Sequence, residues 1–221
     1  MERESIHVDV LIVGGGPAGL AAAIRLADLA RDAGTQIEIL LIEKGATVGA
    51  HSLSGAVVNP SALRELLPDV AESDIPFESP VTSDRVLFLT GRSAFGLPFH
   101  PPYMGNRGFY VASLGKLTRW LAGIAEKKGV QVYPGFAGHE LLYEGERVVG
   151  VRTGDTGIDK QRRPRENYQP GTDIRARVTL LAEGARGHLA KGLIRRLGLD
   201  EGRNPQVYSL GVKELWEVPE G

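Results

Sequence analysis

The sequence contains no cysteine among its 221 residues. Disulfide bonds, thiolate zinc sites, iron–sulfur ligation and cysteine nucleophiles are therefore excluded within these residues. Net charge is also nearly absent, because 26 Lys and Arg residues oppose 27 Asp and Glu residues. No cluster of basic residues is interleaved with aromatic residues, so nucleic-acid binding is not expected. Any redox chemistry at these residues needs a bound cofactor.

Long apolar runs are missing as well. The longest, such as residues 10–13 and 39–42, have the length of strands and fall far short of the roughly 20 residues of a membrane-spanning helix. Residues 1–9 precede the apolar core of the first strand, and they are too few for a secretory signal or a transit peptide. We therefore expect a chain that does not cross a membrane.

Motifs for metal binding and for hydrolysis are absent. The five histidines are scattered, and no pair has the spacing of a metal site. No serine stands in the Gly-x-Ser-x-Gly turn of a hydrolase nucleophile. The sequence therefore predicts neither a metal centre nor catalytic side chains.

What is present begins with a strand, a glycine turn, a helix and a second strand. The expected strands at residues 8–13 and 37–43 contain continuous apolar runs at 10–13 and 39–42. Such runs suit strands that are buried on both faces of a parallel sheet. Between them, an Ala- and Leu-rich segment runs to about residue 33 and predicts a helix. The opening therefore predicts a βαβ unit.

The glycine turn of this unit matches the dinucleotide-binding fingerprint. Gly14 permits a tight turn, Gly16 lets the backbone approach a diphosphate, and Gly19 lets the helix pack closely on the strand. The helix N-terminus then offers free amides and a positive dipole end to the phosphates. The alternative is an ordinary glycine turn, which the strand-to-helix context disfavours. The predicted cofactor contacts in this turn are Gly14, Gly15, Gly16, Pro17, Ala18 and Gly19.

An acidic residue ends the second strand. At this position Glu43, followed by Lys44, would accept hydrogen bonds from an adenosine ribose and would repel a 2′-phosphate. This disfavours NADP and is compatible with NAD or FAD. The alternative is a surface glutamate paired with Lys44.

Later segments favour FAD over NAD. Residues 178–182 form an apolar strand that ends in a second acid–glycine turn, which contains Glu183, Gly184 and Gly187. This arrangement would receive the ribityl and diphosphate part of an extended FAD. The alternative is a plain turn in which Glu183 caps the next helix.

Two further segments are predicted to approach the cofactor. Phe136 and Ala137 follow a short strand at residues 130–133 and would lie beside the adenine. The loop at residues 49–55 is rich in small residues that let a backbone pass close to a ligand, and its predicted contacts are Gly49, His51, Ser54 and Gly55. The alternative is a loop with no ligand.

Elsewhere the pattern predicts further elements and a boundary. The expected elements are helices at 61–67, 114–128 and 188–197, strands at 85–89 and 206–218, a hairpin at 140–153, and a solvated loop at 155–173. The proline-rich residues 74–108 are predicted to leave the sheet as an excursion. The expected fold is an α/β, Rossmann-like FAD-binding domain of the glutathione-reductase type over residues 1–204. Residues 205–221 are expected to start a second, mostly β domain of a truncated protein.

Several segments resemble one family, the electron transfer flavoprotein-ubiquinone oxidoreductases. The most specific are Gly-Ala-His-Ser-Leu-Ser-Gly and Glu-Gly-Ala-Arg-Gly-His-Leu, and the resemblance covers nearly the whole chain. The segments that carry it are residues 13–20, 42–44, 48–55, 80–85, 133–135, 182–189 and 213–216.

The resemblance implies an inner-membrane enzyme that takes electrons from reduced electron transfer flavoprotein and passes them to ubiquinone. Its cofactors would be FAD and a four-iron four-sulfur cluster, whose cysteines are expected only in a C-terminal part that this sequence lacks. A monotopic membrane contact is expected at residues 51–72, where leucines form an apolar helix face. The alternative is that this face packs on the protein's own core. A bacterial location on the cytoplasmic face of the inner membrane is favoured over the mitochondrial inner membrane.

Two rival interpretations remain open at this stage. One is a related FAD-dependent reductase or hydroxylase that acts on a small or isoprenoid substrate. The other is a fragment that no longer holds flavin.

Overall fold

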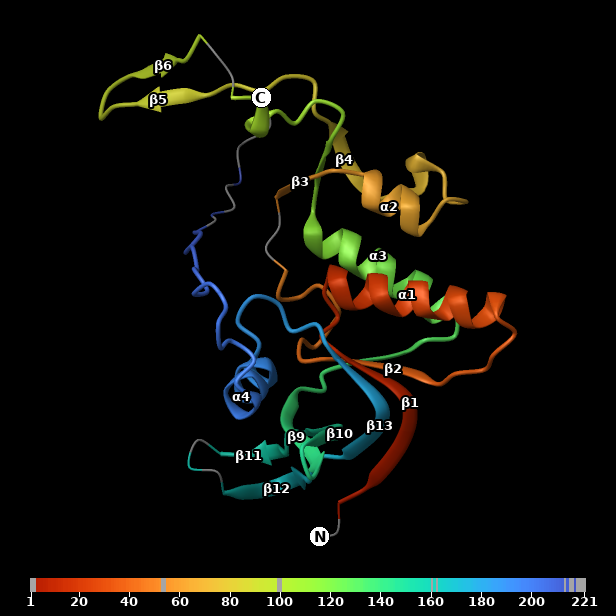
Figure 1. Ribbon diagram of the computed structural model, residues 1–221. Helices are drawn as coiled ribbons and strands as arrows, with labels where there is room; N and C mark the ends of the chain where they lie inside the picture. Colours follow the sequence, from red (N-terminus) through yellow and green to blue (C-terminus); the bar gives the residue numbers. More distant parts are fainter. Residues whose placement is uncertain are drawn as a thin grey trace.

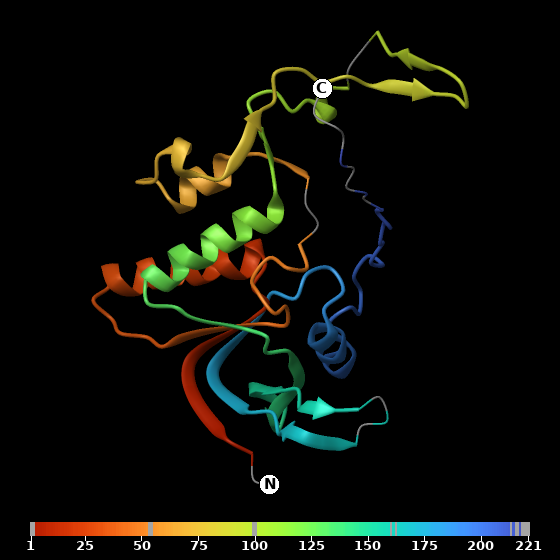
Figure 2. The same cartoon turned by 180° about the vertical axis from the view of Figure 1, so that it is seen from behind.

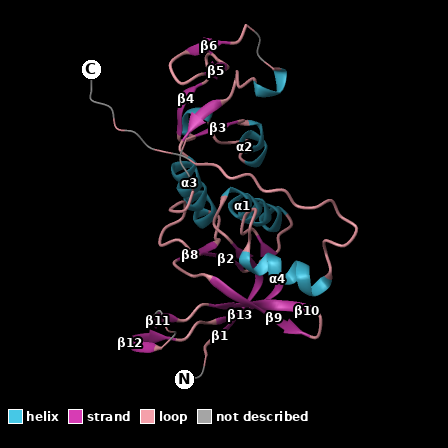
Figure 3. Cartoon of the chain, turned by 90° about the vertical axis from the view of Figure 1, so that its left-hand side faces the viewer, coloured by secondary structure: helices cyan, strands magenta, loops and turns pink. Residues whose placement is uncertain are grey.

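The computed structural model describes residues 3–52, 55–98, 101–159, 161, 163–212, 214 and 217. A twisted six-stranded sheet forms the centre, and helices α1 and α3 lie side by side on one of its faces (Figure 1). An excursion of short strands extends beyond these helices (Figure 3). Seen from behind, α4 lies on the other side of the sheet from α1 and α3 (Figure 2).

The central sheet combines a parallel half and an antiparallel half. Its strand order is β8-β2-β1-β13-β10-β9. Strand β13 pairs in parallel with β1 and antiparallel with β10, so it joins the two halves. The strands are β1 (Ser5–Val13), β2 (Ile39–Glu43), β8 (Gln131–Pro134), β9 (Gly138–Glu144), β10 (Arg147–Thr153) and β13 (Asp173–Leu181). The predicted βαβ unit and the hairpin are both present.

Strands β1 and β2 are apolar because both of their faces are covered. Ile12 and Leu41 face the core that α1 and α3 close. Leu11 and Ile42 face a second core on the other side, together with Val151. Continuous apolar runs are the pattern expected for such doubly covered strands. The predicted α/β fold class is therefore confirmed.

The helices bury the faces that their sequences predict. In α1 (Pro17–Asp32), Leu20, Ala23 and Ile24 are buried against the sheet and α3 (Leu114–Lys127). Just past the end of α3, the Lys128 ammonium lies 2.5 Å from the Asp28 carboxylate of α1. The Leu189 side chain of α4 (His188–Leu197) belongs to the core on the opposite face of the sheet.

The excursion starts earlier than the predicted residues 74–108. Strands β3 (Ala56–Val58), β4 (Phe77–Pro80) and β7 (Tyr110–Ala112) form a three-stranded sheet in the order β3-β7-β4. The Phe77 and Tyr110 rings stack with their centroids 4.3 Å apart. Beyond this sheet, β5 (Leu87–Leu89) and β6 (Ala94–Gly96) form a hairpin that projects from the molecule (Figure 1). Two short 3₁₀ turns, Glu72–Asp74 and Pro102–Met104, complete the excursion.

The predicted solvated loop at residues 155–173 is largely exposed in its described part, but it contains regular structure. These residues contain an antiparallel pair, β11 (Thr156–Ile158) and β12 (Pro164–Gln169). The pair lacks an alternating apolar face, so its polar sequence carries no pattern that predicts strands. At its base, the Asp155 carboxylate pairs with the Arg3 guanidinium and accepts a hydrogen bond from the Gly171 amide at 2.8 Å. These contacts lower the pKa of that carboxyl to about 2.

The predicted strand at residues 206–218 is not formed in the part that the structure describes. Residues 206–212 belong to no helix or strand, and the Leu210 side chain is 95% exposed. A strand needs a paired neighbour, and none is present beside these residues within the described part of the chain. Residues 213, 215, 216 and 218 lie outside the described residues. The domain boundary at residue 204 stays a prediction.

The apolar face of helix α2 (Ser61–Leu66) packs on the protein's own core. Leu63 and Leu67 are buried, and Leu66 and Val70 pack against the same core. This is the alternative that the sequence left open, so core packing covers the apolar face of the helix. A membrane contact elsewhere in residues 51–72 stays a prediction. No helix in the described part of the chain combines the length and apolar composition of a membrane span.

Candidate functional site

A cleft of about 610 Å³ opens where strands β1, β2 and β13 end. The carboxyl ends of parallel strands are where α/β folds bind their ligands. Fourteen of the predicted contacts line this cleft: Gly14, Gly15, Gly16, Pro17, Ala18, Glu43, Lys44, Gly49, His51, Phe136, Ala137, Glu183, Gly184 and Gly187. Tertiary folding thus brings five separated segments to one place.

Three glycines of the turn differ in what an added Cβ would contact. Gly14 has a φ of 112°, and a Cβ there would clash with the carbonyl oxygen of Ala182. A Cβ on Gly19 would clash with the carbonyl oxygen of Gly14. A Cβ on Gly16 would meet nothing within 4 Å. Gly14 and Gly19 therefore permit the packing of strand and helix, whereas Gly16 leaves space open in the cleft.

The N-terminus of helix α1 is left without a side-chain cap. Its N-cap residue is Gly16, Pro17 stands in the first turn, and no acidic residue lies in that turn. Helix N-terminal amides and the dipole then have no anionic partner from the chain's own side chains. This end faces the cleft and suits an anionic group such as a phosphate.

Glu43 is held in a defined position at the end of β2. Its carboxylate oxygens accept hydrogen bonds from the Gly15 amide at 2.8 Å and from the Gly45 amide at 2.7 Å. The Nδ1 atom of His51 lies 3.9 Å from the same carboxylate. The alternative of a surface pair with Lys44 does not describe these contacts. Glu43 connects the second strand to the glycine turn, so it shapes the cleft wall.

Glu183 also lines the cleft, but its carboxylate caps helix α4. Its oxygens accept hydrogen bonds from the Leu189 amide at 3.1 Å and the Ala190 amide at 2.9 Å. This is the arrangement that the sequence allowed as the alternative to a cofactor contact. A role of Glu183 toward a ribityl chain stays a prediction.

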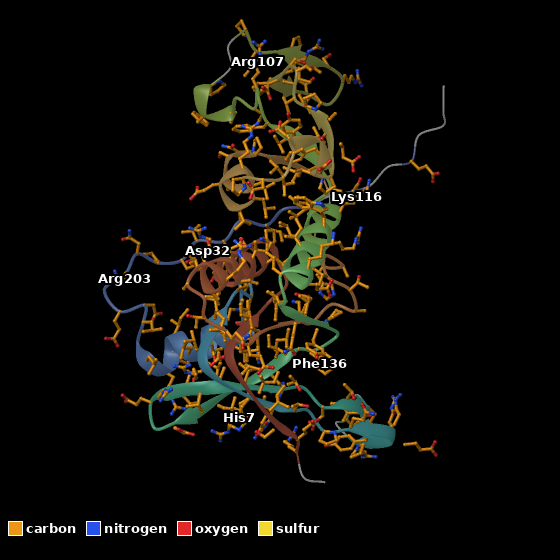
Figure 4. All side chains as sticks on the ribbon, turned by 90° about the vertical axis from the view of Figure 1, so that its right-hand side faces the viewer. His7, Asp32, Arg107, Lys116, Phe136 and Arg203 are labelled. Carbon is orange, nitrogen blue, oxygen red and sulfur yellow. The ribbon has the colours of Figure 1, made fainter. Side chains whose placement is uncertain are left out.

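The loop after β8 reaches the cleft through backbone hydrogen bonds. The Phe136 amide donates to the Glu43 carbonyl at 2.9 Å, and the Gly135 amide donates to the Gly45 carbonyl at 2.8 Å. The Phe136 ring meets the Tyr133 ring edge to face, with centroids 6.0 Å apart. Figure 4 shows Phe136 close to the central sheet and far from Arg107 in the excursion.

Three predicted contacts are placed differently. Gly19 is buried between helix and strand, and Gly55 is not among the residues that line the cleft. Ser54 lies outside the described residues. Eight further lining residues were not predicted as contacts: Val13, Ile42, Ser52, Gly138, Leu181, Ala182, Arg186 and His188. Arg186 and His188 flank the predicted contact Gly187. Their position next to that glycine is the sequence signal that could have identified them as lining residues.

Comparison with known proteins extends these observations. Residues 12–67 match the family described as NAD(P)-binding Rossmann-like domain. This range runs from the end of β1 through the glycine turn, α1 and β2 to the end of α2. It includes the part of the cleft that would receive the adenosine half of a dinucleotide.

The chain is also similar to curated proteins over nearly its whole length. It is 50% identical over 222 residues to the mitochondrial electron transfer flavoprotein-ubiquinone oxidoreductase of Oryza sativa, covering 99% of this chain and 38% of that protein. It is 49% identical to the enzyme of that name from Pseudomonas aeruginosa, covering 99% of this chain and 40% of that protein. The resemblance to the electron transfer flavoprotein-ubiquinone oxidoreductases is confirmed. The chain spans less than half the length of these relatives.

Solved structures show the same fold at lower sequence identity. A geranylgeranyl bacteriochlorophyll reductase-like protein from Thermoplasma acidophilum aligns with a TM-score of 0.59 at 24% identity, covering 85% of this chain and 42% of that one. The myxobacterial chondrochloren halogenase, a variant of FAD-dependent halogenases, aligns with a TM-score of 0.55 at 21% identity. The alignment covers 84% of this chain and 39% of that one. These likenesses confirm the predicted Rossmann-like fold.

Proposed function

We propose that this chain binds FAD and acts as the flavin-binding part of an electron transfer flavoprotein-ubiquinone oxidoreductase. The observation that carries the proposal is the cleft between β1, β2 and β13, lined by the segments that share the family's specific sequence. In this role the reduced electron transfer flavoprotein is the electron donor and ubiquinone is the acceptor. A four-iron four-sulfur cluster remains a prediction for residues outside this sequence, which has no cysteine.

The residues of the cleft fit an extended dinucleotide. The uncapped α1 N-terminus and the open space at Gly16 suit the diphosphate. The fixed Glu43 carboxylate suits the adenosine ribose, and the loop at Phe136 and Ala137 suits the adenine. The second turn at residues 183–187 lines the same cleft as the glycine turn, which supports an extended dinucleotide such as FAD as the ligand.

When bound, the isoalloxazine ring of FAD supplies the electron-transfer chemistry. The chain's own residues bind and orient the cofactor through backbone amides, a fixed carboxylate and glycines. No side chain of the cleft is required as an acid or a base. The proposal therefore predicts that substitutions in the cleft change cofactor affinity before they change a chemical step.

A membrane contact fits the β5–β6 hairpin better than helix α2. Phe88, Leu89 and Phe95 are 62%, 68% and 57% exposed, and they stand on a hairpin that projects from the body (Figure 1). Exposed apolar patches of this kind mark interaction surfaces. We therefore place a peripheral membrane contact at this hairpin, at the inner membrane that the family resemblance implies.

The first experiment is the visible absorption spectrum of the purified chain, followed by anaerobic titration with reduced electron transfer flavoprotein. The proposal predicts flavin bands that this donor bleaches and that NADH does not. A colourless protein that takes up no added FAD would contradict flavin binding. Bleaching by NADH or NADPH with a small or isoprenoid substrate would instead favour a flavin-dependent reductase or hydroxylase.

The membrane contact is tested separately by co-sedimentation with phospholipid vesicles. The double variant Phe88→Ser, Leu89→Ser is expected to lose vesicle binding. Leu199→Ser, at a 52% exposed leucine outside the hairpin, is the matched control and should bind like the wild type. Equal loss in both variants would contradict a contact localised on the hairpin.

A further inference from the structure

We infer that Arg186 is a charge partner for the diphosphate of the bound dinucleotide. The inference rests on the proposed function, because it names a further binding residue in the same cleft. Arg186 lies between two turn glycines, Gly184 and Gly187, and its side chain lines the cleft. None of the glycine, acid or loop patterns above assigns a role to it.

The cleft has few fixed positive charges. Among its described lining residues, only Lys44 and Arg186 carry a permanent positive charge near neutral pH. Lys44 follows β2 and lies at the adenosine end. Arg186 follows β13, and Ala182, the first residue after that strand, lies against the glycine turn at Gly14. Arg186 is therefore the cation on the β13 side of the turn that would hold phosphate.

Acidic neighbours do not neutralise this guanidinium. Among the described residues, Arg186 has no carboxylate within ion-pair distance. The nearest acid in the sequence is Glu183, and its oxygens are already occupied by the Leu189 and Ala190 amides. A dinucleotide diphosphate carries two negative charges, so it would supply the missing counter-charge.

The guanidinium is also oriented. Its Cζ atom lies 5.1 Å from the centroid of the Tyr208 ring, over the ring face. A cation–π contact of this kind uses no hydrogen bond of the guanidinium, so its N–H groups stay available to donate. Two parallel hydrogen bonds to phosphate oxygens are the geometry that arginine favours. Tyr208 thus acts as a positioning residue for Arg186.

The experiment compares ligands with and without phosphate on the full chain. Calorimetric affinities are measured for FAD, ADP and adenosine with the wild type, Arg186→Gln and Arg186→Lys. Arg186→Gln is expected to weaken FAD and ADP binding roughly ten- to a hundredfold and to leave adenosine unchanged. Arg186→Lys should be intermediate, because lysine keeps the charge and loses the two-pronged geometry. Raising the salt concentration should reduce the difference in FAD and ADP affinity between the wild type and Arg186→Gln, because salt screens the charge.

Matched variants separate charge from structure. Arg195→Gln removes an exposed arginine from α4 outside the cleft and should leave all three affinities unchanged. Tyr208→Leu should weaken FAD and ADP binding less than Arg186→Gln, whereas Tyr208→Phe should have no effect because it keeps the ring.

The outcomes distinguish this inference from the proposed function. Unchanged ADP affinity in Arg186→Gln overturns the inference even when FAD binds, and so does an equal loss for adenosine. A wild type that binds ADP no more tightly than adenosine overturns it too. If the chain holds no FAD but ADP binding depends on Arg186, the proposed function fails and the inference stands.

Discussion

The two helix N-termini beside the cleft differ in one respect that decides where an anion can bind. Helices α1 and α4 both follow a strand and a glycine-containing turn. The α1 N-terminus has no side-chain cap and no acid in its first turn. The first amides of α4 donate instead to the Glu183 carboxylate. The same local pattern therefore yields one end that is open to phosphate and one end that the chain itself satisfies.

A strand–glycine–helix pattern is therefore not enough to locate a phosphate-binding site. A helix N-terminus binds anions because its amides lack partners. Once a carboxylate accepts hydrogen bonds from those amides, they are no longer available to bind an anion. The glycine turn before α1 is thus the better position for the diphosphate, and the turn before α4 contributes wall residues, among them Arg186.

The largest expected effect is on stability, at Gly14. Gly14→Ala should lower the free energy of unfolding by about 3 kcal/mol or more, because a Cβ combines an unfavourable φ with a backbone clash. Urea denaturation measures the change. Gly34→Ala, also at positive φ but with nothing near its Cβ, is the control and should cost about 1 kcal/mol. Equal costs would mean that the close packing of Gly14 on Ala182 is unimportant.

The second effect is on affinity, at Gly16. Gly16→Ala should leave the melting temperature nearly unchanged, since the added Cβ meets nothing within 4 Å. It should weaken FAD binding by about a hundredfold, because the side chain would occupy the space beside the α1 N-terminus. Calorimetric unfolding and FAD fluorescence quenching measure the two quantities. Unaltered FAD affinity would contradict the assignment of the diphosphate to the N-terminus of α1.

The third effect sharpens the role of the α4 cap. Glu183→Ala should lower the free energy of unfolding by about 1 kcal/mol, because it leaves the Leu189 and Ala190 amides without their acceptor. Hydrogen exchange at those two amides should accelerate. Glu183→Gln, which keeps one acceptor oxygen, is the matched control and should lose less. Loss of FAD affinity without loss of stability would show that Glu183 acts on the cofactor.

The smallest effect concerns ligand discrimination at Glu43. Glu43→Gln should reduce the preference for ADP over 2′,5′-ADP by a few fold, because it removes the negative charge that repels a 2′-phosphate. Competitive displacement of FAD by the two nucleotides measures the preference. Glu38→Gln, at an acid outside the cleft, should leave the preference unchanged. An unchanged ratio in Glu43→Gln would mean that this carboxylate only shapes the glycine turn.

Much of the fold could be predicted from the sequence alone. Continuous apolar runs located β1 and β2, helical periodicity located α1, α3 and α4, and a turn between alternating segments located the β9–β10 hairpin. These signals are local, because they depend on the period of side chains along the chain. The polar hairpin β11–β12 has no such period, since neither of its faces lies in a core. It was therefore missed.

The candidate site divides in the same way. The fingerprint at residues 14–19 and the acid Glu43 were readable, because the fold places these residue types at fixed local positions. Tertiary structure alone decided that Leu63 and Leu67 of the amphipathic stretch face the core, and that the exposed apolar residues stand on β5 and β6. Periodicity identifies an apolar face but does not identify what covers it.

The sequence by itself therefore determined the βαβ unit, the glycine turn and the acid that follows the second strand. Only the tertiary structure decided that Glu183 caps α4, that α1 stays uncapped, and that Arg186 stacks on Tyr208 beside the cleft. The physical reason is that hydrogen bonds and stacking depend on distances between side chains and backbone atoms after the chain has folded. Sequence patterns record which groups are present, whereas folding decides which groups already have partners.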